Sequence, residues 1–129
     1  MSDTSDQFST IPSKNILIVE DDASIGEMLV EAISSETSHR ALQVIDGEKA
    51  LEVLSDFHPD LFILDYHLPR TNGLQVYDQL HALPELAHVP AILTSAGVMQ
   101  YDMQNRNIVG ISKPVSLNKL LDMIEELLT

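Results

Sequence analysis

The chain has 129 residues, 44% of them hydrophobic, and its 20 acidic residues against 7 basic ones give a formal net charge of −13. This length suits one domain with a full core, and such an acidic surface repels nucleic acid and anionic lipid. The absence of cysteine excludes disulfides, thiol catalysis and cysteine-ligated zinc. No apolar run approaches the roughly 18 residues that cross a membrane. The polar start carries no secretory pattern, so we expect a cytoplasmic protein.

Residues 1–13 are polar and are expected to form a flexible tail ahead of one domain, residues 14–129. Within that domain, apolar runs typical of buried strands alternate with stretches of helical periodicity. Five strands are predicted, at about residues 15–20, 41–45, 61–65, 91–94 and 108–112. A helical segment follows each strand, and residues 97–107 carry the weakest pattern. This alternation predicts an α/β fold, a doubly wound five-stranded parallel sheet with helices on both faces.

Two of the predicted strands end in acids. Glu20 and Asp21 follow the apolar run that ends at Val19, and Asp65 follows the apolar run that ends at Leu64. Open parallel sheets bind ligands outside the carboxyl ends of their strands, so neighbouring strands would bring these acids into one site. Carboxylates so close repel one another, and oxygen ligands without sulfur suit a hard cation. We therefore predict a Mg²⁺ site formed by Glu20, Asp21 and Asp65.

A hydroxyl and a lysine end two further predicted strands. Ser95 ends the fourth strand, and Lys113 follows the fifth. A metal, an ammonium and a hydroxyl together suit the three charged oxygens of a phosphoryl group in transfer. We predict that Asp65 is the nucleophile and forms an acyl phosphate, with Lys113 and Ser95 contacting the phosphoryl oxygens.

Each of these residues also has an ordinary structural interpretation. Asp65 alone suits an acid that caps a loop, Lys113 a surface lysine, and Ser95 the N-cap of a helix. Their combination favours the functional interpretation. The side chain of His67 is expected at the solvent-facing rim of the site, and the other histidines are expected on the surface: His39, His58, His81 and His88.

In this combination the chain resembles the receiver domains of two-component response regulators over about residues 14–128. The resemblance rests on Glu20-Asp21, Asp65, Leu68-Pro69, Asn72-Gly73, Ser95-Ala96 and Lys113-Pro114. It implies that a histidine kinase or phosphotransfer protein phosphorylates Asp65, and that Ser95 and Lys113 contact the phosphoryl group. It also implies that the backbone carbonyl of His67 joins the carboxylates in binding Mg²⁺. The family fold has the flavodoxin-like strand order 2-1-3-4-5, and its Lys-Pro bond is usually cis.

The sequence departs from the family pattern at several positions. Gly110 stands three residues before Lys113, where family members usually carry a Tyr or Phe ring that swings inward. Tyr101 is a candidate to fill that space. Ser95 and Lys113 are eighteen positions apart, several fewer than is usual, which predicts a shortened or irregular fourth helix. The acidic pair also begins with Glu20 rather than Asp, and Ser95 replaces the more frequent Thr.

We expect a stand-alone signalling receiver that catalyses only its own phosphorylation and dephosphorylation, and is otherwise not an enzyme. No effector domain fits after Thr129, so its output would be protein contact or phosphoryl relay. Its expected partners are a histidine kinase or phosphotransfer protein and an unidentified target, without nucleic acid or membrane. The oligomeric state is left open, with a homodimer as one option.

Three other functions are compatible with parts of this sequence. Gly110 favours, as the second choice, a receiver-like interaction module that ignores phosphorylation. A phosphatase of the haloacid-dehalogenase type is disfavoured because His67 stands where that class needs a second acid. A nucleotide- or flavin-binding domain is disfavoured because Glu20 and Asp21 would repel phosphate where such domains cradle it.

Overall fold

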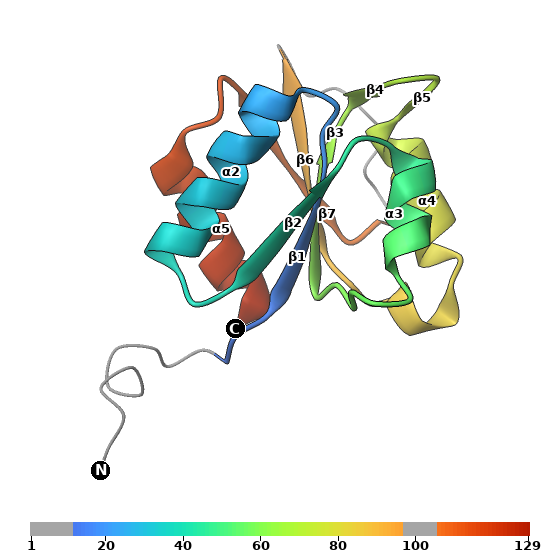
Figure 1. Cartoon of the computed structure of the whole chain (residues 1–129), viewed down its shortest axis with the longest axis horizontal. Helices are drawn as coiled ribbons and strands as arrows, with labels where there is room; N and C mark the ends of the chain where they lie inside the picture. Colours follow the sequence, from blue (N-terminus) through green and yellow to red (C-terminus); the bar gives the residue numbers. More distant parts are fainter. Residues whose placement is uncertain (1–11, 97–105) are drawn as a thin grey trace.

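A twisted five-stranded parallel sheet forms the middle layer of the computed structural model, which describes residues 12–96 and 106–129 (Figure 1). Its order is β2-β1-β3-β6-β7. The strands are β1 (Asn15–Val19), β2 (Arg40–Val44), β3 (Leu61–Asp65), β6 (Ala91–Ala96) and β7 (Ile108–Lys113). In chain order these are strands 2-1-3-4-5 of the sheet, so the predicted doubly wound fold and its strand order are confirmed.

Helices cover both faces of this sheet (Figure 1). On one face lie α2 (Ala23–Glu36) and α5 (Leu117–Leu128), and on the other lie α3 (Gly47–Val53) and α4 (Gly73–His81). A short 3-10 helix, η1 (Pro84–Leu86), follows α4. Most of the weakly predicted helical segment at 97–107 lies outside the described residues, and so do Tyr101 and the first eleven residues of the predicted tail. Within the described part of the chain, no helix has the combined length and apolar character that a bilayer span requires.

The strands divide the core into two hydrophobic clusters, one on each face of the sheet. Successive side chains of a strand point to opposite faces, so Phe62 and Leu64 pack towards α3 and α4 while Ile63 packs towards α2 and α5. All five residues of β3 are buried. This central position explains the unbroken apolar run that precedes Asp65 in the sequence.

Short polar side chains start the helices near the carboxyl edge of the sheet. Asp22 accepts a hydrogen bond from the N–H of Ile25 at the start of α2, and Asp46 does the same for Lys49 in α3. Such caps satisfy N–H groups that have no partner within the helix. The other caps are Asn72 for α4, in a capping box with Gln75, and Ser116 for α5. The loops that follow the strands are therefore tied to helix starts.

The loop predicted at residues 68–73 contains a small antiparallel hairpin. Its strands are β4 (His67–Leu68) and β5 (Thr71–Asn72), and Arg70 at its tip has a φ of 63°. Two-residue strands are too short to give an alternating pattern, so the sequence showed only its turn residues.

Two histidines are less exposed than predicted. His39 is buried, with 4% of its surface exposed, and its Nδ1 accepts a hydrogen bond from the N–H of Lys14 (3.0 Å). Burial lowers the pKa of the His39 imidazole. His81 is half-buried and stacks on the ring of Tyr77, with ring centroids 3.6 Å apart. The surface assignment was wrong for both because a single histidine carries no periodic signal; His58 and His88 are exposed as predicted.

Candidate metal centre

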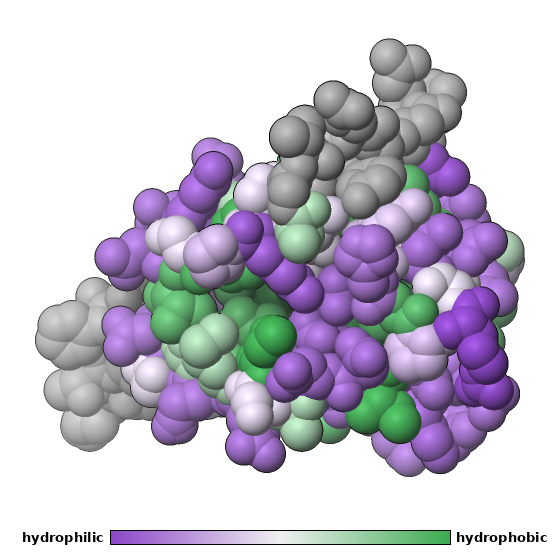
Figure 2. All heavy atoms as spheres, turned by 90° about the horizontal axis from the view of Figure 1, so that it is seen from above, coloured by the Kyte–Doolittle hydropathy of each residue, from purple (hydrophilic) through white to green (hydrophobic). Residues whose placement is uncertain are grey.

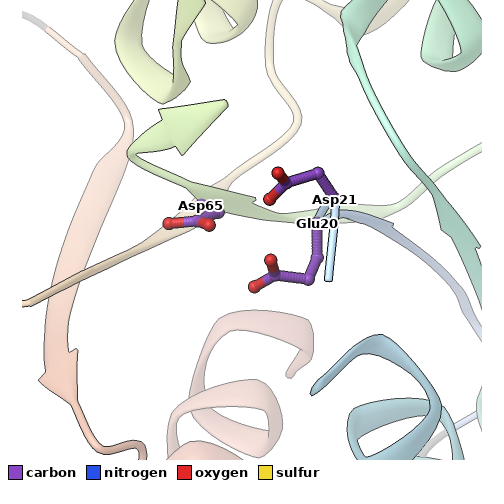
Figure 3. Close-up of side chains that lie close together, drawn as sticks. All are labelled: Glu20, Asp21 and Asp65. Carbon is purple, nitrogen blue, oxygen red and sulfur yellow. The ribbon is translucent and has the colours of Figure 1, made fainter. Parts of the chain in front are cut away.

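Three carboxylates meet at the carboxyl edge of the sheet (Figure 3). Glu20 and Asp21 follow β1, and Asp65 ends the neighbouring strand β3. Because Val19 of β1 is in register with Leu64 of β3, the residues that come next, Glu20 and Asp65, lie beside each other. One oxygen from each of the three carboxylates lies within 4.8 Å of the others. Glu20 and Asp65 are buried, whereas Asp21 is exposed.

Lys113 reaches this cluster from the other side. It ends β7, and β6 separates it from β3 in the sheet. Its Nζ lies 3.1 Å from Oδ1 of Asp65 and 3.6 Å from Oε1 of Glu20. The peptide bond between Lys113 and Pro114 is cis, as the family resemblance implied. One ammonium therefore pairs with two buried carboxylates.

Backbone N–H groups orient the two buried acids. The N–H of His67 donates to Oδ1 of Asp65 (3.2 Å), and the N–H of Asp22 donates to Oε2 of Glu20 (3.1 Å). Beyond Asp65, the N–H of Tyr66 donates to the carbonyl of Thr94 on β6 (2.8 Å). These bonds help to fix the positions of the two buried carboxylates.

The charge of this cluster is unbalanced, because Lys113 faces three carboxylates. Burial raises the pKa of Glu20 from 4.5 to about 7; the N–H of Asp22 lowers it, negative Asp65 raises it and Lys113 lowers it. The three side-chain ligand atoms of this cluster are all carboxylate oxygens. A hard divalent cation with few protein ligands, such as Mg²⁺, fits both this donor set and the excess negative charge.

Ser95 and His67 lie beside the carboxylate cluster, Ser95 buried and the side chain of His67 exposed. Ser95 is fully buried on β6, one residue beyond Thr94, the register partner of Asp65. Its hydroxyl donates to the carbonyl of Ala96 (3.3 Å). The His67 side chain is exposed at the rim, as expected, with its ring edge-on to that of Tyr66. The contact of Ser95 with a phosphoryl group and that of the His67 carbonyl with a metal stay predictions.

Two residues that the sequence analysis did not assign to the site support it. Gly73 begins α4, and a Cβ there would lie 2.7 Å from the carbonyl oxygen of Asp65. Only glycine fits this approach, and the Asn72-Gly73 pair was its visible signal. Gln43 on β2 donates to the backbone carbonyls of Glu20 (2.8 Å) and Asp22 (3.3 Å). Nothing in the sequence marked Gln43, because a polar residue on a half-buried strand is common.

The chain matches the response regulator receiver domain family over residues 16–125. It is 30% identical over 120 residues to the polar-differentiation response regulator DivK of Brucella ovis, a match that covers 90% of this chain and 97% of that protein. Among solved structures, it resembles the receiver domain of a signal transduction histidine kinase from Syntrophus aciditrophicus. That match has 27% identity and a TM-score of 0.78, and covers 90% of each chain.

The chemotaxis protein CheY4 of Vibrio cholerae shares the fold, with a TM-score of 0.82 at 18% identity over 91% of this chain and 100% of that one. The doubly wound sheet of this protein, with three acids and a lysine at its carboxyl edge, has the fold and the site of a receiver domain. The chain belongs to the response regulator receiver domain family, and thus to the proteins of two-component signalling.

Replacing Glu20 by glutamine is expected to stabilise the protein in the absence of Mg²⁺ and to weaken Mg²⁺ binding. The amide keeps the size of the side chain and removes one buried negative charge. We expect the free energy of unfolding to rise by about 1–3 kcal/mol near neutral pH. Urea denaturation with and without Mg²⁺ measures the first effect, and calorimetric titration measures the second.

The stabilisation by Glu20→Gln is expected to depend on pH. The folded-state pKa of Glu20, about 7, lies above its ordinary value of 4.5. The protonated Glu20 side chain therefore contributes to the free energy of unfolding. This contribution is fully present below pH 4.5, the ordinary pKa, and is lost as the pH rises through about 7, the folded-state pKa. The gap between Glu20→Gln and wild type should widen over this interval without Mg²⁺, whereas the exposed control Glu27→Gln should show no such change. A constant gap would contradict the raised pKa.

Proposed function

We propose that this protein is a phosphoacceptor signalling domain, in which Asp65 takes a phosphoryl group from a phosphohistidine of a histidine kinase or phosphotransfer protein. The observation that supports this most is the meeting of Glu20, Asp21, Asp65 and Lys113 at one edge of the sheet. Membership of the receiver family supports the same chemistry. We also propose a cytoplasmic location, as the sequence predicted.

In the proposed step, a carboxylate oxygen of Asp65 attacks the phosphorus. The bond between phosphorus and the donor nitrogen breaks, its electron pair stays on the imidazole, and an acyl phosphate forms. Lys113 and the hydroxyl of Ser95 would contact the phosphoryl oxygens. Mg²⁺, held by Glu20, Asp21, Asp65 and the His67 carbonyl, would supply positive charge to those oxygens. Water later hydrolyses the acyl phosphate, so the protein acts on itself and turns over no separate substrate.

The surface of α2 and α5 supports docking of a protein donor. Figure 2 looks onto the edge where the strands end, and hydrophobic residues gather there on the side of α2 and α5. A groove of about 430 Å³ lies between these helices. Its lining includes Met28 and Leu121, with Glu31 and Glu36 as acidic members. This combination suits a partner that presents apolar and basic side chains.

The proposal is tested by incubating the protein with a small phosphodonor such as acetyl phosphate, with Mg²⁺ or with a chelator, and measuring the intact mass. We expect one phosphoryl group per chain with Mg²⁺, and a large loss of uptake with the chelator. Uptake that fails with Mg²⁺ present would contradict the proposal, and so would uptake that does not depend on the metal.

A second candidate function is an interaction module that ignores phosphorylation. It is favoured by Gly110, which lies on β7 opposite Leu93 of β6 and has no side chain to move when the pocket is filled. Beryllofluoride, which mimics a phosphoryl group, distinguishes the two functions. A phosphoacceptor domain should change its affinity for an identified partner when beryllofluoride binds, and the interaction module should not. We expect a change of about tenfold, which corresponds to a coupling near 1.4 kcal/mol. An unchanged affinity would favour the second function.

A further inference from the structure

The loop that carries Asp21 is held from the neighbouring edge strand by one side chain. Nε2 of Gln43, on β2, donates to the backbone carbonyl of Glu20 (2.8 Å) and to that of Asp22 (3.3 Å). These two residues flank Asp21 directly. The main chain adds a further tie, because the N–H of Glu20 donates to the carbonyl of Val44 (3.0 Å). The residues on both sides of Asp21 are thus attached to β2.

The Gln43 amide sits in space that a glycine leaves free. Gly26 lies in the first turns of α2 and is buried. A Cβ on Gly26 would come within 1.9–2.2 Å of Cδ, Nε2 and Oε1 of Gln43, so any larger residue there would force the Gln43 amide to move. The Asp22 carbonyl also accepts the N–H of Gly26 (2.9 Å). Gln43, Gly26 and Asp22 therefore form one packed unit at the start of α2.

Repulsion among the three carboxylates favours an outward turn of Asp21. Asp21 is exposed, and its carboxylate lies near two buried carboxylates that Lys113 only partly balances. Without restraint, the loop would relax so that Asp21 turns towards water. A restraint on both flanking carbonyls keeps its carboxylate within reach of Glu20 and Asp65, and holding ligands in place beforehand lowers the cost of binding an ion.

We propose that Gln43 is a positioning residue for the divalent ion: its amide holds the Glu20–Asp22 loop so that Asp21 faces the acceptor Asp65 before the ion binds. This inference rests on the proposed function, because it concerns the Mg²⁺ site. Gln43 touches neither the ion nor the phosphoryl group. It acts through the two carbonyls that it binds.

The test replaces Gln43 by methionine, which keeps the length of the side chain and removes both N–H donors. We expect the Kd for Mg²⁺, measured by calorimetric titration, to rise about tenfold. Phosphoryl uptake from acetyl phosphate should need more Mg²⁺ and should reach the wild-type rate once Mg²⁺ is saturating. The matched control is Gln79→Met, an exposed glutamine on α4 that lies outside the carboxylate cluster, and its Kd should match that of wild type.

A second variant reaches the same contact from the other side. Gly26→Ala keeps the Gln43 amide but fills the space that it occupies, so it should also weaken Mg²⁺ binding. In a Gln43→Ala background the same change should weaken it no further. A role in stability alone would lower the Tm of Gln43→Met and leave its Kd unchanged, which would overturn the inference. A wild type that binds no Mg²⁺ would instead overturn the metal site itself, and the inference with it.

Discussion

Replacing Asp65 by asparagine is expected to abolish phosphoryl uptake and to leave the fold intact. Asparagine has nearly the same shape, and its amide is not a nucleophile. We expect the rate of uptake from a small phosphodonor to fall at least about a thousandfold. A time course of intact mass measures this fall. Because the substitution also removes a buried negative charge, urea denaturation without Mg²⁺ should show a variant at least as stable as wild type.

The control for this experiment is Asp56→Asn, which removes an exposed acid outside the carboxylate cluster. It should take up one phosphoryl group at the wild-type rate. An Asp65→Asn variant that still gained a phosphoryl group would show that another residue accepts it. Equal loss in both variants would point to net charge and not to the identity of the acceptor.

Replacing Lys113 by methionine is expected to destabilise the protein in the absence of Mg²⁺. The change removes the ammonium that lies 3.1 Å from Asp65 and 3.6 Å from Glu20, and leaves two buried carboxylates unbalanced. We expect the free energy of unfolding to fall by about 1–3 kcal/mol, and the pKa of Glu20 to rise further. Added Mg²⁺ should restore part of the loss. Urea denaturation with and without the ion measures both effects.

A double variant isolates the part of this effect that depends on the charge of Glu20. In a Glu20→Gln background one of the repelling charges is gone, so Lys113→Met should cost less stability than it does in wild type. Lys119→Met, which removes an exposed lysine of α5, serves as the control and should change little. Equal losses in the two backgrounds would mean that the charge of Glu20 has no part in the effect, which would contradict the expected pairing of Lys113 with Glu20.

The sheet and its acids could be predicted from the sequence because both depend on local patterns. A strand covered on both faces gives an unbroken apolar run, and a polar residue directly after it marks the carboxyl edge. Leu61–Asp65 shows this most clearly, since all five residues are buried and Asp65 belongs to the carboxylate cluster. The order of the strands came from the family resemblance, and the structure confirms it.

The remaining features depend on contacts between distant parts of the chain. Gln43 became part of the site through its distance to the carbonyl of Glu20, 23 residues away. His39 is buried by contacts that include the N–H of Lys14, 25 residues away. The need for glycine at position 73 comes from the carbonyl of Asp65. Contacts of this kind leave no periodic pattern in the sequence. The roles of isolated residues such as Gln43, His39 and Gly73 could therefore not be predicted from it.

A crystal structure of the wild-type protein with Mg²⁺ and beryllofluoride tests the central claim most directly. It should show the ion in contact with Asp21 and Asp65, the beryllofluoride on a carboxylate oxygen of Asp65, and Lys113 within hydrogen-bond distance of its fluorines. Beryllofluoride bound at another residue, or an ion held away from these carboxylates, would contradict the claim that this edge of the sheet is the phosphoacceptor site.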